Sequence, residues 1–297
     1  MRVLVTGASG FIGGVACERL GAKGHDVLAL VRRPGSEPVG TTAVQADLTD
    51  GAALTAAVRG AAPEAVVHLA AEIASQRSVA KLEAVNVGGT QRLLDACAEL
   101  PEPPRIVFAS TVVTGDAHGA LLTPEKPLPV ETAYGRTKQE AERLVLASGF
   151  PASVVRPSHV YGSGGWYAEE IVRRLKQPGR FAMIGSGGNW WDVVHVDDVA
   201  SALVAALEGA PDGAIYHCAD DQPITERDFL GLTADALGVG PPRSLPAWLA
   251  GVVAGREVVA ALTRSARSSN EKLKAELGWV PTYPTAQVGV PAAVAGL

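Results

Sequence analysis

Tyr134 and Lys138 are four residues apart in the segment ETAYGRTKQEAERLVL, which has the composition of a helix. Residues at positions i and i+4 share one face of a helix, so the phenol and the ammonium would lie side by side. A neighbouring cation favours the ionised phenol and brings its pKa toward the range useful for general acid/base catalysis. An exposed helical surface could carry the same pair. Together with the glycine pattern near the start of the chain, however, the pair indicates a nucleotide-dependent redox enzyme.

That glycine pattern is the turn TGASGFIG, in which Gly7, Gly10 and Gly13 are spaced as G-x-x-G-x-x-G. The turn comes directly after the strand-like run RVLVT and opens a helical stretch. Glycines there allow a tight turn and let backbone amides approach a pyrophosphate at the positive end of the helix. An ordinary strand-to-helix turn is the alternative, but the surrounding pattern favours a dinucleotide site.

The residues after the second strand-like run, DVLALV, bear on the choice of cofactor. The run ends at Val31 and is followed by Arg32 and Arg33, where the adenine ribose of a dinucleotide is expected. Two guanidinium groups with no carboxylate suit a 2′-phosphate through charge-assisted, bidentate hydrogen bonds. NADPH is therefore favoured over NADH, with NAD still possible. A solvated surface pair of arginines is the alternative.

A second cofactor contact is expected after the third strand, in the segment VQADLTD. Asp47 is placed to meet the adenine amino group, with Leu48 packing beside it. Asp47 or Thr49 could instead cap the following helix through a side-chain oxygen. The two interpretations of Asp47 are nearly equal on sequence grounds.

The order of the elements predicts the fold class. Over residues 1–160, short β-branched runs alternate with Ala-rich helical stretches, and continuous apolar strands indicate burial on both faces. This rhythm predicts an α/β protein with a Rossmann-type, doubly wound parallel sheet that binds ligands at the carboxyl ends of its strands. We expect segments at about 192–218 to return to this domain. A smaller, discontinuous substrate-binding subdomain is expected at 161–191 and 219–297.

Composition excludes several other classes of protein. The 297 residues carry a net charge of −5 with no run of like charges, which gives no footprint for nucleic acid or an anionic membrane. Cys17, Cys97 and Cys218 lack metal-ligand spacing, so no metal site is predicted and a reducing cytoplasm fits. The opening strand leaves no room for a signal peptide. The apolar stretch from Trp248 to Leu262 is too short to span a bilayer and predicts an amphipathic helix.

Several motifs in a fixed order give the chain a family resemblance. They are the glycine turn, Asp47-Leu48, the HLAA of His68 to Ala71, Asn86, Ser110, and the Tyr134/Lys138 pair, followed by RPSHVYG, VHVDDVA and SNEKLKAELGWVP. In this order the chain resembles the extended short-chain dehydrogenase/reductases, also called NAD-dependent epimerase/dehydratases. The resemblance covers nearly the whole chain. It implies a Rossmann domain for the dinucleotide, a C-terminal domain for the substrate, and an active site between them.

The resemblance also implies a role for each catalytic residue. Tyr134 would exchange a proton with the substrate oxygen, while Lys138 would lower the pKa of Tyr134 and bind the nicotinamide ribose. Ser110 would hold the substrate oxygen and is preferred to Thr111. Asn86 would organise a water molecule and the proton path, with a helix-capping or core amide as the alternative. The implied cofactor-binding residues are Gly7, Gly10, Phe11, Ile12, Gly13, Arg32, Arg33, Asp47, Leu48, Leu69, Ala70, Ala71, Tyr134, Lys138, Pro157 and Val160.

Other polar residues have simpler interpretations. His68, His159 and His195 are not at metal-ligand spacing and fall in segments whose family role is structural or cofactor-lining. Asp197 and Asp198 precede a helical run, where we expect a carboxylate to cap unpaired amides.

The Gly-rich loops hold a group of aromatic residues that has two interpretations. They could form the wall of a pocket for an apolar or planar substrate, and they could equally pack in the core. The residues are Trp166, Tyr167, Trp190 and Trp191.

The reaction is less constrained, because this scaffold serves ketone reduction, alcohol oxidation, epimerisation and dehydration. Thr111 and Val112 follow Ser110 where nucleotide-sugar dehydratases carry an acidic pair, and Trp191 precedes Asp192 where sugar-nucleotide enzymes often have a basic residue. Basic partners for a sugar-nucleotide diphosphate would have to come from the C-terminal portion. The candidates there are Arg243, Arg256, Arg264 and Arg267.

The favoured prediction is an NADPH-dependent reductase that acts on a ketone or aldehyde in a small, partly hydrophobic substrate. A nucleotide-sugar epimerase with tightly bound NAD is the main alternative. A non-catalytic dinucleotide sensor is the remote alternative, since Ser110, Tyr134 and Lys138 are all present. The expected partner is a small molecule, with no nucleic acid and no membrane. Homodimerisation through the Asn86 and Tyr134 helices is allowed but not required.

Overall fold

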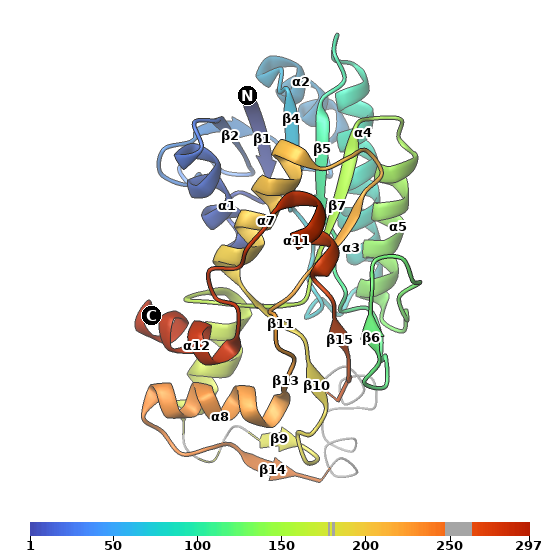
Figure 1. Cartoon of the computed structure of the whole chain (residues 1–297). Helices are drawn as coiled ribbons and strands as arrows, with labels where there is room; N and C mark the ends of the chain where they lie inside the picture. The colour runs from blue at the N-terminus through green and yellow to red at the C-terminus, as the bar shows by residue number, and fades with distance from the viewer. Residues whose placement is uncertain (178, 180–181, 247–262) are drawn as a thin grey trace.

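The computed structural model describes residues 1–177, 179, 182–246 and 263–297. Seven parallel strands form its central sheet (Figure 1). In spatial order they are β12 (Ile215–Cys218), β7 (Ala152–Pro157), β5 (Arg105–Ala109), β4 (Ala65–His68), β1 (Arg2–Thr6), β2 (Asp26–Val31) and β3 (Thr42–Gln45). The predicted Trp248–Leu262 helix lies outside the described residues.

The strands form where the sequence has continuous apolar runs. Every residue of β4 and β7 is buried, and so is every residue of β1 except Arg2. The edge strand β3 is mostly exposed. Burial on both faces is what a parallel sheet covered by two helical layers requires, so the predicted doubly wound α/β fold is confirmed.

Helices cover both faces of the sheet (Figure 1). Apolar residues of α1 (Phe11–Ala22) and α7 (Val196–Gly209) pack with residues of β1, β2 and β4 on one face. On the other face, α2 (Gly51–Ala61) and α4 (Gly88–Ala98) share a cluster with β1 and β2, and α5 (Ala133–Ala147) packs with β5 and β7. The remaining helical pieces near this face are α3 (Val79–Leu82) and the π-helix η1 (Glu83–Val87).

The strand order reverses between β1 and β4. The chain runs outward from β1 to β2 and β3, and then crosses to the other side of β1. In Figure 1 the N-terminus lies at the top, so β1 and its parallel partners run toward the lower part of the molecule. Ligands of doubly wound sheets bind at such a reversal, outside the carboxyl ends of the strands. The glycine turn after β1 and the HLAA segment after β4 meet at this point.

The lower part of the molecule is built from short elements around a second apolar cluster (Figure 1). Its helices are η2 (Tyr167–Val172), α6 (Arg173–Leu175), α8 (Glu226–Leu237) and α12 (Ala286–Ala295). The two-stranded pairs are β8 (His159–Tyr161) with β11 (Val193–His195), β10 (Trp190–Trp191) with β13 (Ile224–Thr225), β9 (Ala182–Ile184) with β14 (Arg243–Leu245), and β6 (Leu121–Leu122) with β15 (Arg267–Ser268). The predicted domain boundaries stay a prediction.

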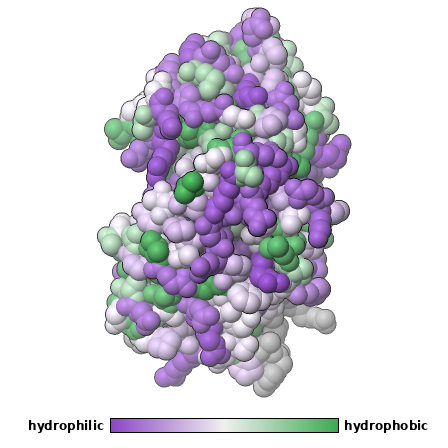
Figure 2. All heavy atoms as spheres, in the orientation of Figure 1, coloured by the Kyte–Doolittle hydropathy of each residue, from purple (hydrophilic) through white to green (hydrophobic). Residues whose placement is uncertain are grey.

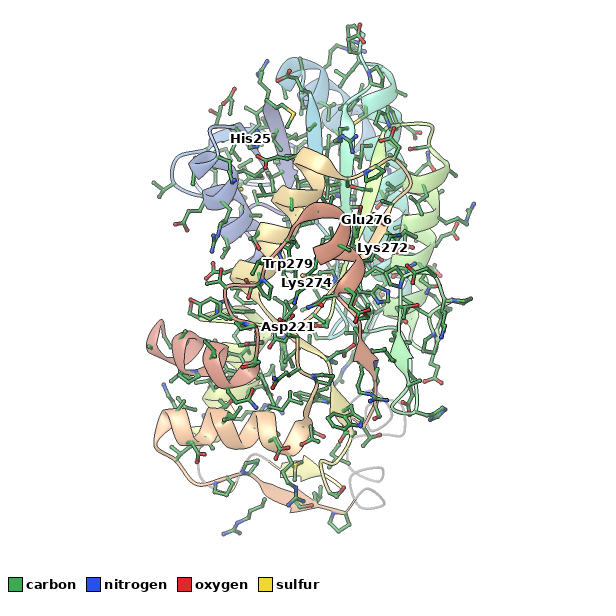
Figure 3. All side chains as sticks on the ribbon, in the orientation of Figure 1. His25, Asp221, Lys272, Lys274, Glu276 and Trp279 are labelled. Carbon is green, nitrogen blue, oxygen red and sulfur yellow. The ribbon has the colours of Figure 1, made fainter. Side chains whose placement is uncertain are left out.

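A C-terminal helix, α11 (Glu271–Leu277), returns to the sheet and carries several of the residues labelled in Figure 3. The ammonium of Lys274 lies 2.5 Å from a carboxylate oxygen of Asp221, and Tyr216 donates a 2.8 Å hydrogen bond to Glu276. Just beyond the helix, Trp279 Nε1 donates to Ser201 Oγ over 2.9 Å. These bonds join the last part of the chain to β12 and α7.

The start of α7 differs from the prediction that an aspartate caps it. The helix begins at Val196, and its cap is His195, whose Nδ1 accepts a hydrogen bond from the Asp197 amide over 3.3 Å. Asp198 is fully buried and accepts backbone hydrogen bonds from Thr282 (2.5 Å) and Tyr283 (2.9 Å). Its carboxylate therefore binds a segment that is distant in the sequence, and the local sequence gives no sign of this contact.

The face shown in Figure 2 is mainly hydrophilic, with apolar residues in small, separate patches. Within the described ranges, no helix is long and apolar enough to cross a bilayer.

Candidate active site

The glycine turn packs closely against the segment that follows β4. Gly7 has φ +68°, and a Cβ there would lie 2.8 Å from the Ala70 amide nitrogen. Gly10 precedes α1 without any side-chain cap, and the first turn of the helix contains no acidic residue. The helix therefore presents unpaired amides and its positive end to the crevice between β1 and β4, which suits a pyrophosphate.

We expect Gly13→Ala to abolish cofactor binding and to destabilise the fold. A Cβ at Gly13 would lie 2.1 Å from the Gly7 carbonyl oxygen, so the helix or the turn must move, at a cost of about 1–3 kcal/mol or more. The matched control is Gly14→Ala in the same helix, where an added Cβ would meet no atom within 4 Å other than the neighbouring backbone of the helix. Unfolding in urea and cofactor titration by fluorescence measure both effects. If Gly13→Ala bound cofactor as well as Gly14→Ala, the assignment of this turn would be wrong.

Several other residues of the predicted cofactor-binding set lie in or next to the glycine turn. The ring of Phe11 packs against the loop at 162–165, so closely that a Cβ on Gly165 would lie 2.6 Å from it. Ile12 packs against the core of the sheet. Thr6 Oγ1 accepts hydrogen bonds from the amides of Leu69 (3.2 Å) and Ala70 (3.1 Å).

Arg32 and Arg33 follow the end of β2 and are exposed. Neither guanidinium forms an ion pair with a residue in the described ranges. Asp47 accepts two hydrogen bonds from Thr49, which lower its pKa, and Arg32 contributes to the same effect. Leu48 packs against α4 in the core. Neither Asp47 nor Thr49 caps α2, because Asp50 accepts the capping hydrogen bond from Ala53.

Asn86 lies in η1, where the widened helical turn was not expected. Its side chain is 2% exposed, accepts from the Glu72 amide (2.8 Å) and donates to the Glu72 carbonyl (3.1 Å) and to Thr137 Oγ1 (3.0 Å). Thr137 in turn donates to the carbonyl of Tyr134 over 2.9 Å. Asn86 therefore connects the segment after β4 to the first turn of the Tyr134 helix. π-Helical turns are frequent at functional sites.

The two hydroxyls after β5 have different surroundings. Thr111 Oγ1 donates to the Pro157 carbonyl over 3.3 Å and accepts from the Val113 amide over 3.0 Å. Ser110 Oγ is buried and has no hydrogen-bond partner among the described residues. A buried hydroxyl without a partner is costly and uncommon. Ser110 is thus the hydroxyl available to a ligand, which supports its choice over Thr111.

Tyr134 and Lys138 lie in the first turns of α5, beside the segment that follows β5. Thr132 caps the helix, and a Cβ on Gly135 would lie 2.8 Å from Thr114. Lys138 is 3% exposed, and its Nζ lies 4.2 Å from the ring centroid of Phe108, two residues before Ser110. Lys138 is thereby brought to the carboxyl end of β5 with Ser110, and Tyr134 adjoins Gly135, which packs against the segment that follows β5.

The pKa directions at this pair differ from the predicted ones. Burial raises the pKa of Tyr134 to about 12, where we expected Lys138 to lower it. Burial also lowers the pKa of Lys138 to about 7, although Glu142 opposes this shift. Both groups are pushed toward their neutral forms because the low-dielectric surroundings penalise charge. Desolvation is therefore the main cause of the pKa shift of each group.

His68 is buried behind the pair and stays neutral. Burial, with a contribution from Lys138, lowers its pKa to about 3. Its ring nitrogens lie 2.6 Å from Thr6 Oγ1 and 2.9 Å from Thr90 Oγ1. His68 is thus a fixed structural group under the glycine turn, in agreement with its predicted role.

Sequence reasoning missed two buried ion pairs near these residues. Arg156 in β7 binds Glu142 in α5 through two hydrogen bonds of 3.0 and 2.5 Å. Arg264 binds Asp192 over 2.8 Å, donates to the carbonyls of Gly115 (2.8 Å) and Val112 (3.0 Å), and holds the pKa of Asp192 well below its usual range against the effect of burial. The charges are visible in the sequence, but their pairing across 14 and 72 positions is not.

Three of the four predicted diphosphate-binding arginines are placed by the structure. The guanidinium of Arg264 is occupied by Asp192 and by two carbonyls. Arg267 donates to the Gly119 carbonyl over 2.9 Å and lies over Trp190. Arg243 is exposed in β14, and Arg256 lies outside the described residues. None of the three is shown with a free guanidinium beside Ser110.

The aromatic residues of the Gly-rich loops divide into two pairs. Tyr167 and Trp191 are buried in the second apolar cluster. Trp166 and Trp190 are partly exposed. Trp166 donates to the carbonyl of Val160 over 2.7 Å, and the ring of His159 stacks on Trp191 at a centroid distance of 5.3 Å. Only part of the predicted aromatic wall is therefore exposed to a substrate.

Comparison with known proteins agrees with this fold and site. The family model described as "NAD dependent epimerase/dehydratase family" matches residues 3–219, and the chain belongs to that family. The chain is 34% identical to 3-diazoavenalumate denitrifying reductase of a Streptomyces species, covering 98% of this chain and 99% of the relative. It is 31% identical to 2-alkyl-3-oxoalkanoate reductase of Stenotrophomonas maltophilia, covering 82% and 77%.

A solved structure of similar shape is the UDP-glucose 4-epimerase of Thermus thermophilus in complex with NAD. It superposes with a TM-score of 0.85 at 26% identity, covering 100% of this chain and 98% of that one. The family binds NAD, and the named relatives include reductases and epimerases. The protein is an NAD(P)-dependent oxidoreductase of the extended short-chain dehydrogenase/reductase type.

Proposed function

We propose that this enzyme uses NADPH to reduce a ketone or aldehyde in a small, partly hydrophobic substrate. The observation that carries the proposal is the buried, unpartnered Ser110 hydroxyl at the carboxyl end of β5, in the same region as Tyr134 and Lys138. Relatives named as reductases support it. The bound dinucleotide would supply the hydride.

The residues of this chain would supply the binding and the proton. Ser110 Oγ would donate a hydrogen bond to the substrate oxygen, which satisfies its own unmet hydrogen bond. Tyr134, whose pKa is raised by burial, stays protonated at neutral pH and can give its proton to the oxygen as negative charge develops. Lys138 in its ammonium form would stabilise the resulting phenolate. Asn86 would keep the first turn of α5 aligned through Thr137.

Sugar-nucleotide epimerisation is the weaker alternative. It requires cationic groups for a diphosphate, and the buried Arg264 already serves Asp192 and two carbonyls. Arg267 is likewise bound to the Gly119 carbonyl. Because these two guanidinium groups are already bound within the protein, a substrate without a diphosphate is favoured.

The cofactor preference provides the first experiment. Arg32 and Arg33 are exposed and without ion-pair partners among the residues described, so they are free to bind a 2′-phosphate. We expect wild-type protein to bind NADPH more tightly than NADH. We expect Arg32→Ala to weaken NADPH binding by roughly ten- to hundredfold, since hydrogen bonds to charged groups contribute about 1.5–3 kcal/mol. NADH binding should stay unchanged.

Arg59→Ala, which removes an exposed arginine paired with Glu99 on the surface, is the control for a general loss of positive charge. Calorimetric titration of the three cofactor-free proteins with NADPH and with NADH measures these affinities. Tightly retained NAD in freshly purified protein would instead support the epimerase, because such an enzyme returns the hydride to the same substrate. A carbonyl-substrate screen follows if NADPH is preferred.

A second candidate is the replacement of a diazonium group by hydride. It is favoured by the 34% identity, over nearly the whole chain, to a relative named a denitrifying reductase of a diazo compound. The two candidates differ in the use of a proton. Carbonyl reduction needs a proton on the product oxygen and hence Tyr134, whereas replacement of a diazonium group by hydride releases dinitrogen and needs no proton donor. The effect of Tyr134→Phe on each substrate therefore separates them.

A further inference from the structure

Two buried charges continue the row that begins with Tyr134 and Lys138. Glu142 is four residues beyond Lys138 on α5, so Lys138 and Glu142 share a helical face. Arg156 reaches Glu142 from β7 with two hydrogen bonds, and both side chains are less than a tenth exposed. No hydrogen-bond acceptor for Lys138 Nζ is found in the described part of the chain, where its cation faces the Phe108 ring. The Glu142 carboxylate is thus paired with Arg156 and lies one helical turn from Lys138, whose protonated form its negative charge favours.

The other titratable groups around this row are neutral or directed elsewhere. His68 on β4 faces Lys138, and burial lowers its pKa to about 3. His217 on β12 lies 3.4 Å from Arg156, and burial together with Arg156 lowers its pKa to about 4. Glu72, beside Asn86, is paired with Lys81. Two groups near Lys138 remain. The charge of Tyr134 can change by titration, and the charge of Glu142 can be removed by substitution.

We propose that Glu142 and Arg156 are positioning residues that together set how readily Lys138, and through it Tyr134, releases its proton. The proposal rests on the proposed acid/base role of Tyr134 and Lys138. Glu142 holds the proton on Lys138 by its negative charge, and Arg156 offsets most of that charge. The pair also fixes the Glu142 carboxylate between α5 and β7, so its distance from Lys138 is constant.

The sign of each effect follows from the charges. Removing the carboxylate in Glu142→Gln makes Lys138 lose its proton at lower pH, which leaves less ammonium to stabilise a Tyr134 phenolate. Removing the guanidinium in Arg156→Gln leaves Glu142 uncompensated, so Lys138 holds its proton to higher pH. The double variant restores the net charge and should return close to wild type. A merely structural role of the ion pair would move both single variants in the same direction.

The experiment is a titration of the cofactor-free protein. Protein carrying 13C-labelled lysine is followed by NMR, and the Lys138 signal is assigned by its absence in Lys138→Met. We expect its midpoint to fall by about one pH unit in Glu142→Gln and to rise by about one unit in Arg156→Gln, which is the size of effect that a charge one helical turn away produces. The alkaline limb of kcat/KM for carbonyl reduction should move the same way.

Two controls keep the test specific. Glu140→Gln breaks an exposed ion pair with Arg143 on the same helix and should leave the midpoint unchanged. Arg156→Lys keeps the positive charge and should also leave it unchanged. If the single neutral variants do not fold, Glu142→Asp decides, since it retracts the carboxylate by one methylene and should lower the midpoint by a smaller amount.

The outcomes separate this proposal from the proposed function. If Tyr134→Phe keeps full carbonyl turnover, the proposed function fails. A different result would defeat only the present proposal. In that case Tyr134→Phe is inactive, but the Lys138 midpoint does not differ between wild type, Glu142→Gln and Arg156→Gln. Where those variants do not fold, the same conclusion follows if the midpoint does not differ between wild type and Glu142→Asp. Shifts of the same sign in both single variants would also overturn it.

Discussion

Replacing Tyr134 by phenylalanine is expected to lower kcat for carbonyl reduction by about a thousandfold and to leave NADPH affinity within about twofold, since a positioned acid contributes roughly 10²–10⁴ to the rate. Phenylalanine keeps the ring and its packing in α5 but removes the hydroxyl that gives its proton to the substrate oxygen. Steady-state kinetics and cofactor titration on the same preparation measure the two quantities.

Tyr216→Phe is the matched control for this substitution. It removes a buried tyrosine hydroxyl that donates to Glu276 on α11, away from the glycine turn and Ser110. Its cost is a stability loss on the order of 1 kcal/mol with unchanged turnover. Turnover within a few-fold of wild type in Tyr134→Phe would refute the acid/base assignment and leave hydride transfer without a proton donor as the reaction to test.

Lys138→Met is expected to have opposite effects on activity and stability. Turnover should fall by at least about a hundredfold, because the phenolate of Tyr134 would form without a stabilising cation. Stability at pH 6 should rise by a few kcal/mol. The pKa of Lys138 is lowered from 10.5 to about 7 by burial, and each pKa unit is worth about 1.36 kcal/mol.

The pH dependence of this stabilisation has a definite sign. Wild-type Lys138 binds a proton less readily in the folded than in the unfolded state, so its destabilising effect is full below about pH 7 and disappears as the pH approaches 10.5. The gain from Lys138→Met should therefore be larger at pH 6 than at pH 9. Urea unfolding of both proteins at the two pH values measures it. A gain that is larger at pH 9 would mean that Lys138 is not buried as a desolvated cation.

Together these predictions describe a site whose proposed catalytic groups lower the free energy of unfolding. Ser110 Oγ is buried without a partner in the described structure, and Lys138 is a desolvated cation. Both are unfavourable for folding alone. A substrate oxygen and the 2′- and 3′-hydroxyls of a nicotinamide ribose are groups that would satisfy them.

Much of the fold and part of the site could be predicted from the sequence because the signals are local. The apolar runs of β1, β2, β4, β5 and β7 form strands where predicted, since burial on both faces demands continuous hydrophobic residues. The three glycines adopt the required turn because their spacing and their lack of a Cβ decide the backbone there. The i, i+4 spacing of Tyr134 and Lys138 likewise follows from helical geometry alone.

Tertiary structure decided the properties that depend on distant partners. The local sequence suggested that Asp197 or Asp198 caps α7, yet Asp198 binds the amides of Thr282 and Tyr283, while His195 caps the helix. The pairing of Asp192 with Arg264 removed a candidate diphosphate ligand. Sequence determined which groups are present and how neighbours along one helix are spaced. Only the folded chain decided which charges are desolvated and paired, because solvation and Coulomb energy depend on distance in space and not on separation along the chain.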